Sequence, residues 1–295
     1  MNIKKFYTTL WRVAIRKNNT CGHLPEVSQP FYVIKNPWWG WAADPFIVED
    51  NGRIYLFAEI FSYFTDRGYL GYCEIVQGKP GAWKVVIKEK YHLSFPNIFK
   101  EGNTFFICPE SYEDKTIHLY KAVTFPDQWA YDRTLVGGEE CVDTVFYRNG
   151  NSQYGFTGIR RSLHLFKIGQ GQVEFCSENP IVDDVHSSRP AGNFISTSKG
   201  DYRVSQLYGQ SYGEGIIFSL IDLQWPMYQE TEIRRWLPSN IVLENAQNTA
   251  TGLHTYNQSE QYEVIDLKYC EFLVLPFILG LFKRVFKRLG LYRRT

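Results

Sequence analysis

A short segment recurs five times along this chain, and the recurrence limits the folds that the chain can adopt. Each copy opens at or beside a polar residue, continues as a β-type run and reaches a polar turn, which contains Gly, Asn or Asp in the first four copies and is Gln258-Ser259-Glu260 in the last. The copies open at Asp44, Phe95, Asp143, Arg189 and His254, at intervals of 51, 48, 46 and 65 residues. About four strands per unit at a period of roughly 45–50 residues are typical of propeller blades. We therefore predict an all-β fold, a five-bladed β-propeller.

The propeller is expected to span residues 1–267. Its last unit is short of strands, and the alternating segment 11–16 is predicted to complete this fifth blade. The long fourth interval indicates an insertion within residues 226–248, where residues 230–237 are predicted to form a short helix. A β-sandwich is the alternative for a chain of short strands, but it leaves the repeat unexplained.

The segment 268–295 departs from the repeat. Residues 272–282 are almost wholly apolar, but this run is only 11 residues long and a membrane span needs about 20. Beyond it, basic and apolar side chains fall on separate faces of a helix. This composition predicts a C-terminal amphipathic helix that contacts a membrane peripherally through residues 272–294. The alternative is a helix docked on the propeller.

The charge of the chain is segregated. The formal net charge is only +1, yet residues 1–17 carry +5 and residues 268–295 carry +6, which leaves −10 on the body. Basic ends on an acidic body argue against nucleic-acid binding by the main domain. The N-terminus lacks an apolar stretch of signal-peptide length, and the six scattered cysteines fit a reducing compartment. We therefore expect a cytoplasmic protein, peripheral on the inner face of the cytoplasmic membrane.

Equivalent positions of a propeller repeat converge on the central axis, so the opening residues are candidates for chemistry. Two carboxylates held at different pKa values can serve as acid and as base or nucleophile in glycosidic chemistry. The predicted catalytic residues are Asp44 as base or nucleophile, Glu110 as acid, and Asp143, which tunes the acid and orients the sugar. Each of the three has a structural alternative, such as capping a turn.

Further polar and aromatic residues near the repeat positions are candidates for substrate binding. An arginine can clamp a phosphate or a carboxylate, an imidazole can hydrogen-bond a sugar hydroxyl, and an aromatic ring can stack on a sugar. The predicted substrate-binding residues are Glu59, Trp41, Ser94, Arg189, His254 and Gln206. Aromatic residues make up 17% of the chain, and most of them are expected in a sheet-rich core. No metal site and no cofactor is predicted.

Several short motifs resemble a known family. Ala43-Asp44-Pro45-Phe46, Pro109-Glu110-Ser111, Val142-Asp143-Thr144 and Ser188-Arg189-Pro190-Ala191-Gly192 occur in the order found in the N-terminal propeller domain of glucosamine inositolphosphorylceramide transferases and of bacterial surface-polysaccharide homologues. The resemblance covers about residues 11–268. It implies a five-bladed propeller related in shape to arabinanase- and fructosidase-type glycosidases, whose first-blade catalytic aspartate corresponds in position to Asp44. The separate C-terminal glycosyltransferase domain of the plant proteins has no counterpart in this sequence.

Three functions remain open from the sequence. The first is a carbohydrate-active enzyme of surface polysaccharide or glycolipid biosynthesis, which transfers or cleaves a glycosyl unit and whose partners are a sugar donor and a glycan or lipid-linked acceptor. The second is a non-catalytic glycan-binding propeller that recruits a partner glycosyltransferase. The third is a structural scaffold, which would fill its central channel with apolar side chains instead of ionisable ones.

Overall fold

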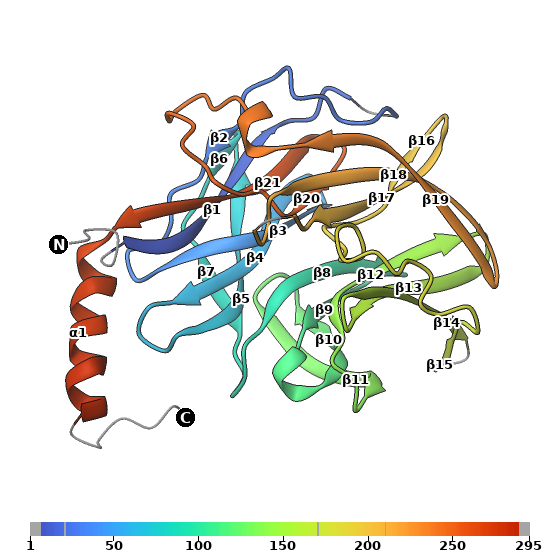
Figure 1. Cartoon of the computed structure of the whole chain (residues 1–295), viewed down its shortest axis with the longest axis horizontal. Helices are drawn as coiled ribbons and strands as arrows, with labels where there is room; N and C mark the ends of the chain where they lie inside the picture. The colour runs from blue at the N-terminus through green and yellow to red at the C-terminus, as the bar shows by residue number, and fades with distance from the viewer. Residues whose placement is uncertain (1–6, 21, 170, 210, 289–295) are drawn as a thin grey trace.

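Five antiparallel sheets surround a common centre in the computed structural model (Figure 1). The structure describes residues 7–20, 22–169, 171–209 and 211–288, with side chains to Lys283 in the C-terminal helix. The fold is the predicted all-β, five-bladed β-propeller with one α-helix near the C-terminus. In blades 2, 3 and 4, strands that follow one another in the chain are hydrogen-bonded neighbours, so each of these blades is an antiparallel meander.

Four of the blades are built from consecutive segments of the chain. Blade 1 holds β3 (Gly40–Asp50), β4 (Arg53–Ser62) and β5 (Arg67–Val76), with β6 (Lys79–Pro80) and β7 (Lys84–Ile87) along β5. Blade 2 holds β8 (Ser94–Glu101), β9 (Thr104–Glu110), β10 (Thr116–Thr124) and β11 (Gln128–Gly137). Blade 3 holds β12 (Val142–Asn149), β13 (Ser152–Ile159), β14 (Ser162–Gly169) and β15 (Gln172–Phe175). Blade 4 holds β16 (Ile195–Thr197), β17 (Gly200–Leu207), β18 (Gly215–Gln224) and β19 (Met227–Trp236).

The fifth blade joins the two ends of the chain and closes the ring. It holds β20 (Tyr256–Gln258), β21 (Tyr262–Phe272), β1 (Tyr7–Lys17) and β2 (Tyr32–Val33). The segment expected over residues 11–16 is therefore part of β1, which pairs with β21 along its whole length. The guanidinium of Arg16 forms a buried ion pair with Glu263 on β21. The ring is therefore closed by the pairing of β1 with β21, the first and the last strands of the described chain.

Three blades open with the same local backbone distortion. Asp44, Phe95 and Asp143 have positive φ angles of 51°, 46° and 49°. In each case the strand register shifts at that point. A non-glycine residue in this region costs about 1–2 kcal/mol, so three equivalent occurrences show a bulge that the fold keeps in each repeat. The bulge places the opening residues of these blades at equivalent positions beside the axis.

Aromatic side chains pack between neighbouring blades. The rings of Phe46 in blade 1 and Phe95 in blade 2 meet edge to face, with centroids 4.9 Å apart. The rings of Tyr147 in blade 3 and Phe194, just before β16, are 4.7 Å apart. A fully buried ring of this size contributes about 1.5–3 kcal/mol. Most of the aromatic content is thus used in the core, as expected.

The helix predicted over residues 230–237 is wrong, because this segment lies in strand β19. Its residues alternate along β18 in a long hairpin, and the carboxylate of Glu230 accepts two hydrogen bonds of 2.7 Å from the buried guanidinium of Arg203 on β17. This pairing requires the extended backbone. The long fourth interval comes instead from the length of this hairpin and from the loop 237–255, which contains a single 3₁₀ turn, Pro238–Asn240.

Helix α1 (Val274–Arg288) follows the last strand and stands at the edge of the disc (Figure 1). Strand β21 continues past residue 267 to Phe272, so the tail begins later than expected. Nζ of Lys283 donates to Oδ2 of Asp66 at 2.5 Å and to the carbonyl oxygen of Tyr63 at 3.2 Å, which ties α1 to the β4–β5 hairpin. In the described part of the chain, no helix is long and apolar enough to cross a membrane.

Candidate functional site

Arginine 189 joins two of the predicted catalytic carboxylates at the centre of the disc. Its Nε donates to Oδ2 of Asp143, and its Nη2 donates to Oε2 of Glu110 at 3.1 Å. Asp143 opens blade 3, Glu110 ends the second strand of blade 2, and Arg189 precedes blade 4. Residues from three blades therefore meet at one point. The side chain of Arg189 is 31% exposed and that of Glu110 is 13% exposed, so these two groups are the most accessible of the cluster.

Glutamine 206 supports Asp143 from behind. Its Nε2 donates to Oδ2 of Asp143 at 2.9 Å and to the carbonyl oxygen of Pro190 at 3.2 Å. Gln206 lies near the end of β17 and is almost fully buried. From the sequence we predicted that Gln206 binds substrate. In the structure its side-chain amide donates a hydrogen bond to the carboxylate of Asp143. It fixes the orientation of Asp143 without lining an open surface.

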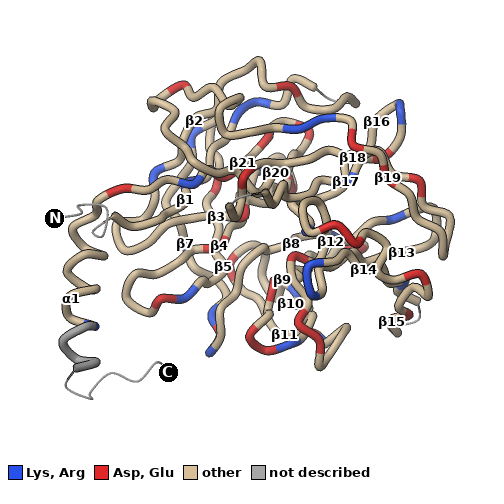
Figure 2. The backbone as a smooth tube through the Cα atoms, viewed as in Figure 1, with Lys and Arg blue, Asp and Glu red and all other residues tan. Residues whose placement is uncertain are grey.

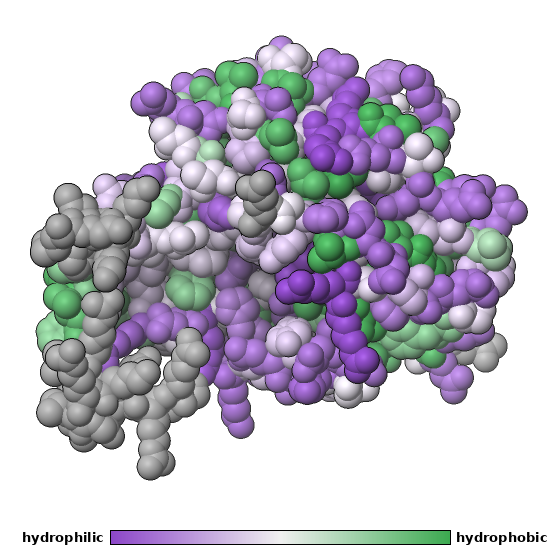
Figure 3. Space-filling model, viewed as in Figure 1, coloured by the Kyte–Doolittle hydropathy of each residue, from purple (hydrophilic) through white to green (hydrophobic). Residues whose placement is uncertain are grey.

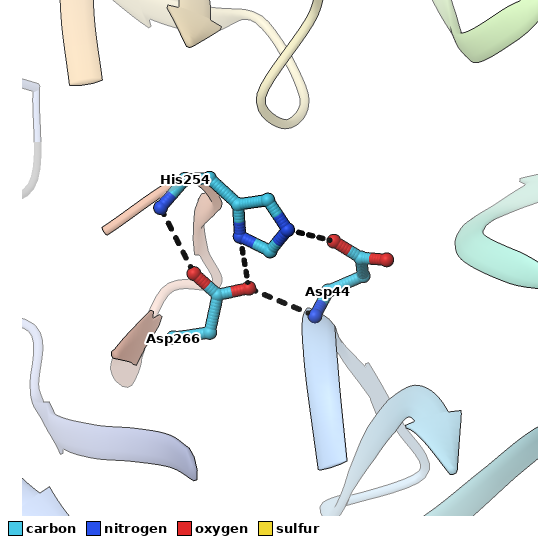
Figure 4. Close-up of side chains that lie close together, drawn as sticks. All are labelled: Asp44, His254 and Asp266. Atoms are coloured by element: carbon cyan, nitrogen blue, oxygen red, sulfur yellow. Dashed lines mark hydrogen bonds and ion pairs between the residues drawn. The ribbon is translucent and has the colours of Figure 1, made fainter. Parts of the chain in front are cut away.

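A second cluster lies between blades 1 and 5, where His254 stands between two carboxylates (Figure 4). Its Nδ1 is 2.7 Å from Oδ2 of Asp266, and its Nε2 is 3.4 Å from Oδ1 of Asp44. Asp266 also accepts from the backbone N–H groups of Asp44 at 3.0 Å, His254 at 3.1 Å and Thr255 at 3.0 Å. Asp266 is therefore a buried anchor that holds the first and last blades in register.

Asp44 receives hydrogen bonds from both neighbouring blades. Oγ1 of Thr255 in the loop before β20 donates to Oδ1 at 3.0 Å, and the backbone N–H of Phe95 in blade 2 donates to Oδ2 at 3.2 Å. The ring of Trp11 stacks on His254 at 3.9 Å, and the ring of Tyr212 meets His254 edge to face at 5.2 Å. Asp44 and His254 are both buried, and two aromatic rings contact the imidazole of His254.

Burial and neighbouring charges separate the pKa values of the carboxylates. Burial raises the pKa of Asp44 to about 7, an effect that His254 opposes and Glu59 and Asp266 reinforce. Burial, followed by the charge of Asp143, raises the pKa of Glu110 well above its usual range, although Arg189 opposes the shift. Glu110 is thereby favoured in its protonated form and is suited to donate a proton.

The imidazole of His254 lies between two carboxylates that shift its pKa upward. Burial alone would lower the pKa of His254, but the facing carboxylates of Asp266 and Asp44 outweigh burial and raise it. A protonated His254 in turn favours the ionised form of Asp44. The predicted base or nucleophile and the predicted acid therefore lie in different electrostatic surroundings.

One group in the described part of the chain has ligand atoms close enough together to meet on a cation, namely Asp44, His254 and Asp266. Their facing atoms already meet each other or the donors of Thr255 and Phe95. These ion pairs and hydrogen bonds account for the arrangement of the trio, although within the described residues Nδ1 of His254 makes no hydrogen bond beyond its ion pair with Asp266. We derive no chemistry from a metal at this place.

The other predicted substrate-binding residues surround the two clusters. Glu59 lies on β4, and its Oε1 is 3.1 Å from Nε2 of His92, within ion-pair distance. Ser94 is buried and pairs in register with Glu110. The ring of Trp41 stacks on Phe61 of the neighbouring strand at 4.6 Å, so that one of its faces is covered. The role of these three residues in substrate binding stays a prediction. One face of the Trp41 ring is already covered by Phe61.

Sequence reasoning missed Asp266, Thr255, Trp11 and Tyr212. For Asp266 there was a signal, because an acidic residue inside the apolar run Val264-Ile265-Asp266-Leu267 must be buried and therefore must have partners. Trp11 could be placed only by knowing that β1 closes the ring beside His254. Tyr212 lies in the β17–β18 loop, and Cζ of Arg189 is 5.4 Å from the centre of the Tyr212 ring.

The fold of this chain resembles that of several solved glycoside hydrolases. The catalytic domain of the Coprinopsis cinerea GH62 α-L-arabinofuranosidase superposes with a TM-score of 0.59 at 10% identity, over 78% of this chain and 91% of that one. A GH43 β-xylosidase/α-arabinofuranosidase from a compost microbial metagenome superposes with a TM-score of 0.53 at 10% identity, over 80% and 93% of the two chains. At this identity the likeness establishes the fold alone.

The sequence itself identifies the family. Residues 20–263 match the family described as glucosamine inositolphosphorylceramide transferase 1, N-terminal, and the chain belongs to that family. It is 28% identical over 207 residues to the glucosamine inositolphosphorylceramide transferase 1 of Arabidopsis thaliana, covering 65% of this chain and 27% of that protein. It is 28% identical over 269 residues to the protein of the same name from Oryza sativa subsp. indica, covering 84% of this chain and 35% of that protein. The chain thus spans about a third or less of these relatives.

Proposed function

We propose that this protein is a carbohydrate-active enzyme of surface polysaccharide or glycolipid biosynthesis that transfers a glycosyl unit at the carboxylate-lined centre of the propeller. The observation that carries the proposal is the pairing of Arg189 with both Asp143 and Glu110, beside an Asp44 whose pKa lies near 7. The relatives are named as transferases that act on a glycolipid, which supports this substrate class. The reaction uses a sugar donor and a glycan or lipid-linked acceptor.

The proposed reaction divides the proton transfers between two carboxyl groups. Glu110 gives its proton to the oxygen that leaves the anomeric carbon of the donor as that bond breaks. Asp44, in its ionised form, takes the proton of the acceptor hydroxyl as the hydroxyl oxygen bonds to the anomeric carbon, or attacks that carbon itself in a two-step transfer. Asp143 keeps Glu110 protonated through its charge and is itself held by Arg189 and Gln206.

A second candidate function is a glycan-binding propeller that recruits a partner glycosyltransferase. The observation in its favour is that the match spans only part of the relatives: the chain corresponds to 27% to 35% of their length. In that case the central carboxylates hold sugar hydroxyls and perform no proton transfer. A scaffold without a ligand is disfavoured, because the described centre is ionisable and not apolar.

We also propose that helix α1 holds the protein on the inner face of the cytoplasmic membrane. Residues Val274, Ile278, Leu281 and Phe282 are 42% to 62% exposed, and hydrophobic side chains show along the outer edge of α1 in Figure 3. The net charge of +6 on residues 268–295 complements an anionic leaflet. Lys283 of α1 is tied to Tyr63, in the turn that follows the end of β4 carrying Glu59. In this proposal a lipid-linked acceptor approaches the site from the membrane that α1 contacts.

The test is a transfer assay with purified protein, a panel of nucleotide sugars and lipid-linked acceptors. Asp44→Asn should reduce transfer by at least 1,000-fold (about 4 kcal/mol) while circular dichroism shows an intact fold. The control is Asp222→Asn, because Asp222 is an exposed carboxylate on β18 outside the centre; it should transfer at the wild-type rate. Sugar binding without turnover by the wild type would favour the recruiting propeller, and wild-type transfer by Asp44→Asn would refute the catalytic proposal.

A further inference from the structure

A pocket opens beside the central cluster, and arginines dominate its charged lining. It has a volume of about 320 Å³ and is lined by Arg160, Arg161 and Arg189 together with Tyr112, Tyr208 and Tyr212 among others. Arg189 borders both this pocket and the carboxylates Glu110 and Asp143. A ligand in the pocket would therefore lie next to the proposed reacting groups. A volume above about 300 Å³ is in the range of small-molecule sites.

The first two arginines form the two-residue turn between β13 and β14. Ile159 pairs with Ser162, so that Arg160 and Arg161 alone make the loop, and both have positive φ angles, of 51° and 70°. Such a turn strongly favours Asn and Gly, because other residues are strained there. Two consecutive arginines are an unfavourable choice for the turn itself. Strained backbone of this kind commonly occurs where side chains bind a ligand.

Neither turn arginine has a partner of its own. Both are exposed, and within the described residues neither makes an ion pair or a side-chain hydrogen bond. The turn shows as a blue segment beside β14 in Figure 2. Arg160 acts on the carboxylate of Glu140 only at longer range, where its charge adds to that of Lys115 in lowering the pKa of Glu140, so the guanidinium groups of the turn keep their hydrogen-bond donors for an anion.

The acidic groups around the pocket are already engaged. Oε1 of Glu140 pairs with Lys115 at 2.8 Å, and its Oε2 accepts from the hydroxyl of Tyr112 at 3.2 Å. Asp183 accepts from Ser162 at 2.6 Å, and Asp184 accepts from Ser187 at 2.9 Å and from the backbone N–H of His186 at 3.0 Å. The carboxylates of Asp143 and Glu110 face Arg189. Among the described residues that line the pocket, Glu140 and Arg189 are in ion pairs, whereas Arg160 and Arg161 are not.

We propose that this pocket is a phosphate-binding subsite, in which Arg160 and Arg161 hold the phosphate group of a substrate and Arg189 joins it to the central site. Guanidinium groups bind phosphate oxygens in pairs, and tyrosine hydroxyls on the other walls can donate to the remaining oxygens. The phosphate belongs either to the nucleoside diphosphate of a sugar donor or to the phosphodiester headgroup of a lipid acceptor. Its place in a transfer reaction rests on the proposed function, whereas the binding itself does not.

Titration calorimetry on the full chain tests the subsite without any assay of turnover. The probes are inorganic phosphate, uridine diphosphate and glycerophosphoglycerol, a soluble phosphodiester headgroup. The double variant Arg160→Gln/Arg161→Gln should weaken binding of the preferred probe at least tenfold. The matched control is Arg148→Gln, because Arg148 is exposed near the opposite end of the same blade, where it pairs in register with Gln153. This control should bind as tightly as the wild type.

The outcomes separate the two sources of phosphate and can refute the subsite. Tighter binding of uridine diphosphate than of the phosphodiester assigns the pocket to the donor, and the reverse order assigns it to the acceptor. The proposal is overturned if no probe binds, if the double variant binds all probes as the wild type does, or if Arg148→Gln weakens binding equally. Loss of transfer in Asp44→Asn with unchanged phosphate binding would support both proposals, and phosphate binding without any transfer would remove only the catalytic one.

Discussion

Nη2 of Arg189 lies 3.1 Å from Oε2 of Glu110, although 79 residues separate the two in the chain. The same guanidinium holds Asp143, so that one cation faces two carboxyl groups in a half-buried setting. Arg189 therefore determines how negative the centre is. Without it, two acidic groups would face each other with only Gln206 to hold one of them.

We expect Arg189→Gln to lower the free energy of unfolding by about 1–3 kcal/mol, the usual cost of leaving a buried polar group without its partner. Urea denaturation at pH 7 measures the change. Arg235→Gln is the control, because Arg235 and Glu232 form an ion pair on β19 in which both side chains are more than 40% exposed, and such a pair contributes about 0–1 kcal/mol. Equal losses of unfolding free energy in the two variants would show that Arg189 does not stabilise the central cluster.

The raised pKa of Asp44 predicts a particular pH dependence of stability. Unfolding restores the ordinary pKa, so between about pH 4 and pH 7 the folded state binds more protons at this site than the unfolded state. Stability from this group therefore falls as the pH rises through that range and is level above it. His254, whose pKa is also raised, acts in the same direction.

We expect Asp44→Asn to flatten this part of the stability profile. The variant gains stability relative to the wild type as the pH is raised from 4 to 7, because it has no carboxyl group to ionise at position 44. Thermal unfolding of both proteins at intervals across this range gives the difference curve. Asp222→Asn, whose side chain is exposed, should give a flat difference. A difference curve for Asp44→Asn that falls or stays level would contradict the raised pKa.

The repeat register could be read from the sequence because the fold imposes the same bulge on successive blades. Asp44, Phe95 and Asp143 share a positive φ angle and a register shift, and these constraints leave similar short motifs in the sequence. The convergence of Asp143, Arg189 and Glu110 followed from that register. Reasoning from equivalent positions works when a residue opens a strand beside the axis.

Contacts made between blades could not be read in the same way. Asp266 and Tyr212 lie outside the equivalent positions and act through their place beside His254. The segment 230–237 was misread as a helix because its many charged side chains resemble an exposed helical face. Its extended form is fixed by Arg203 on β17, which is buried and needs the carboxylate of Glu230.

The closure of the ring depends on a buried ion pair on β1 and β21. The side chains of Arg16 and Glu263 are 5% and 1% exposed, and Arg16 also donates to the carbonyl oxygens of Gln29 at 2.8 Å and Glu26 at 2.5 Å. Glu263→Gln should cost about 3–5 kcal/mol, because it leaves the guanidinium as an uncompensated buried charge. Denaturant unfolding measures the loss.

The control for ring closure is Glu271→Gln on the same strand. Glu271 pairs with Arg12 on β1, but there the side chains are 35% and 27% exposed, so the loss should be about 1 kcal/mol or less. If the two variants lose the same free energy, burial of the Arg16 pair is not what holds the blade closed.

The exposed apolar face of α1 predicts binding to anionic vesicles. Ile278→Glu/Phe282→Glu should reduce co-sedimentation with vesicles of anionic phospholipid at least tenfold, because two exposed apolar side chains are replaced by charges that the lipid repels. Binding of the wild type should weaken with added salt. Val123→Glu is the control, since Val123 is an exposed apolar residue of blade 2 away from α1. A similar loss in the control, or no wild-type binding, would argue for a helix that is simply docked on the propeller.

The strained turn between β13 and β14 offers a test in which stability and binding change in opposite directions. Arg160→Asn/Arg161→Gly installs the residues that the left-handed backbone of this turn favours. Relief of two strained positions should raise the free energy of unfolding by about 1–2 kcal/mol, while removal of both guanidinium groups should weaken phosphate binding at least tenfold. Urea denaturation and calorimetry on the same preparation measure the two effects. The β3–β4 turn of this protein already has the Asn-Gly pair, because Asn51 and Gly52 occupy it with φ angles of 51° and 74°. A variant that loses stability would show that the arginines support the hairpin, and their presence in the turn would then need no ligand to explain it.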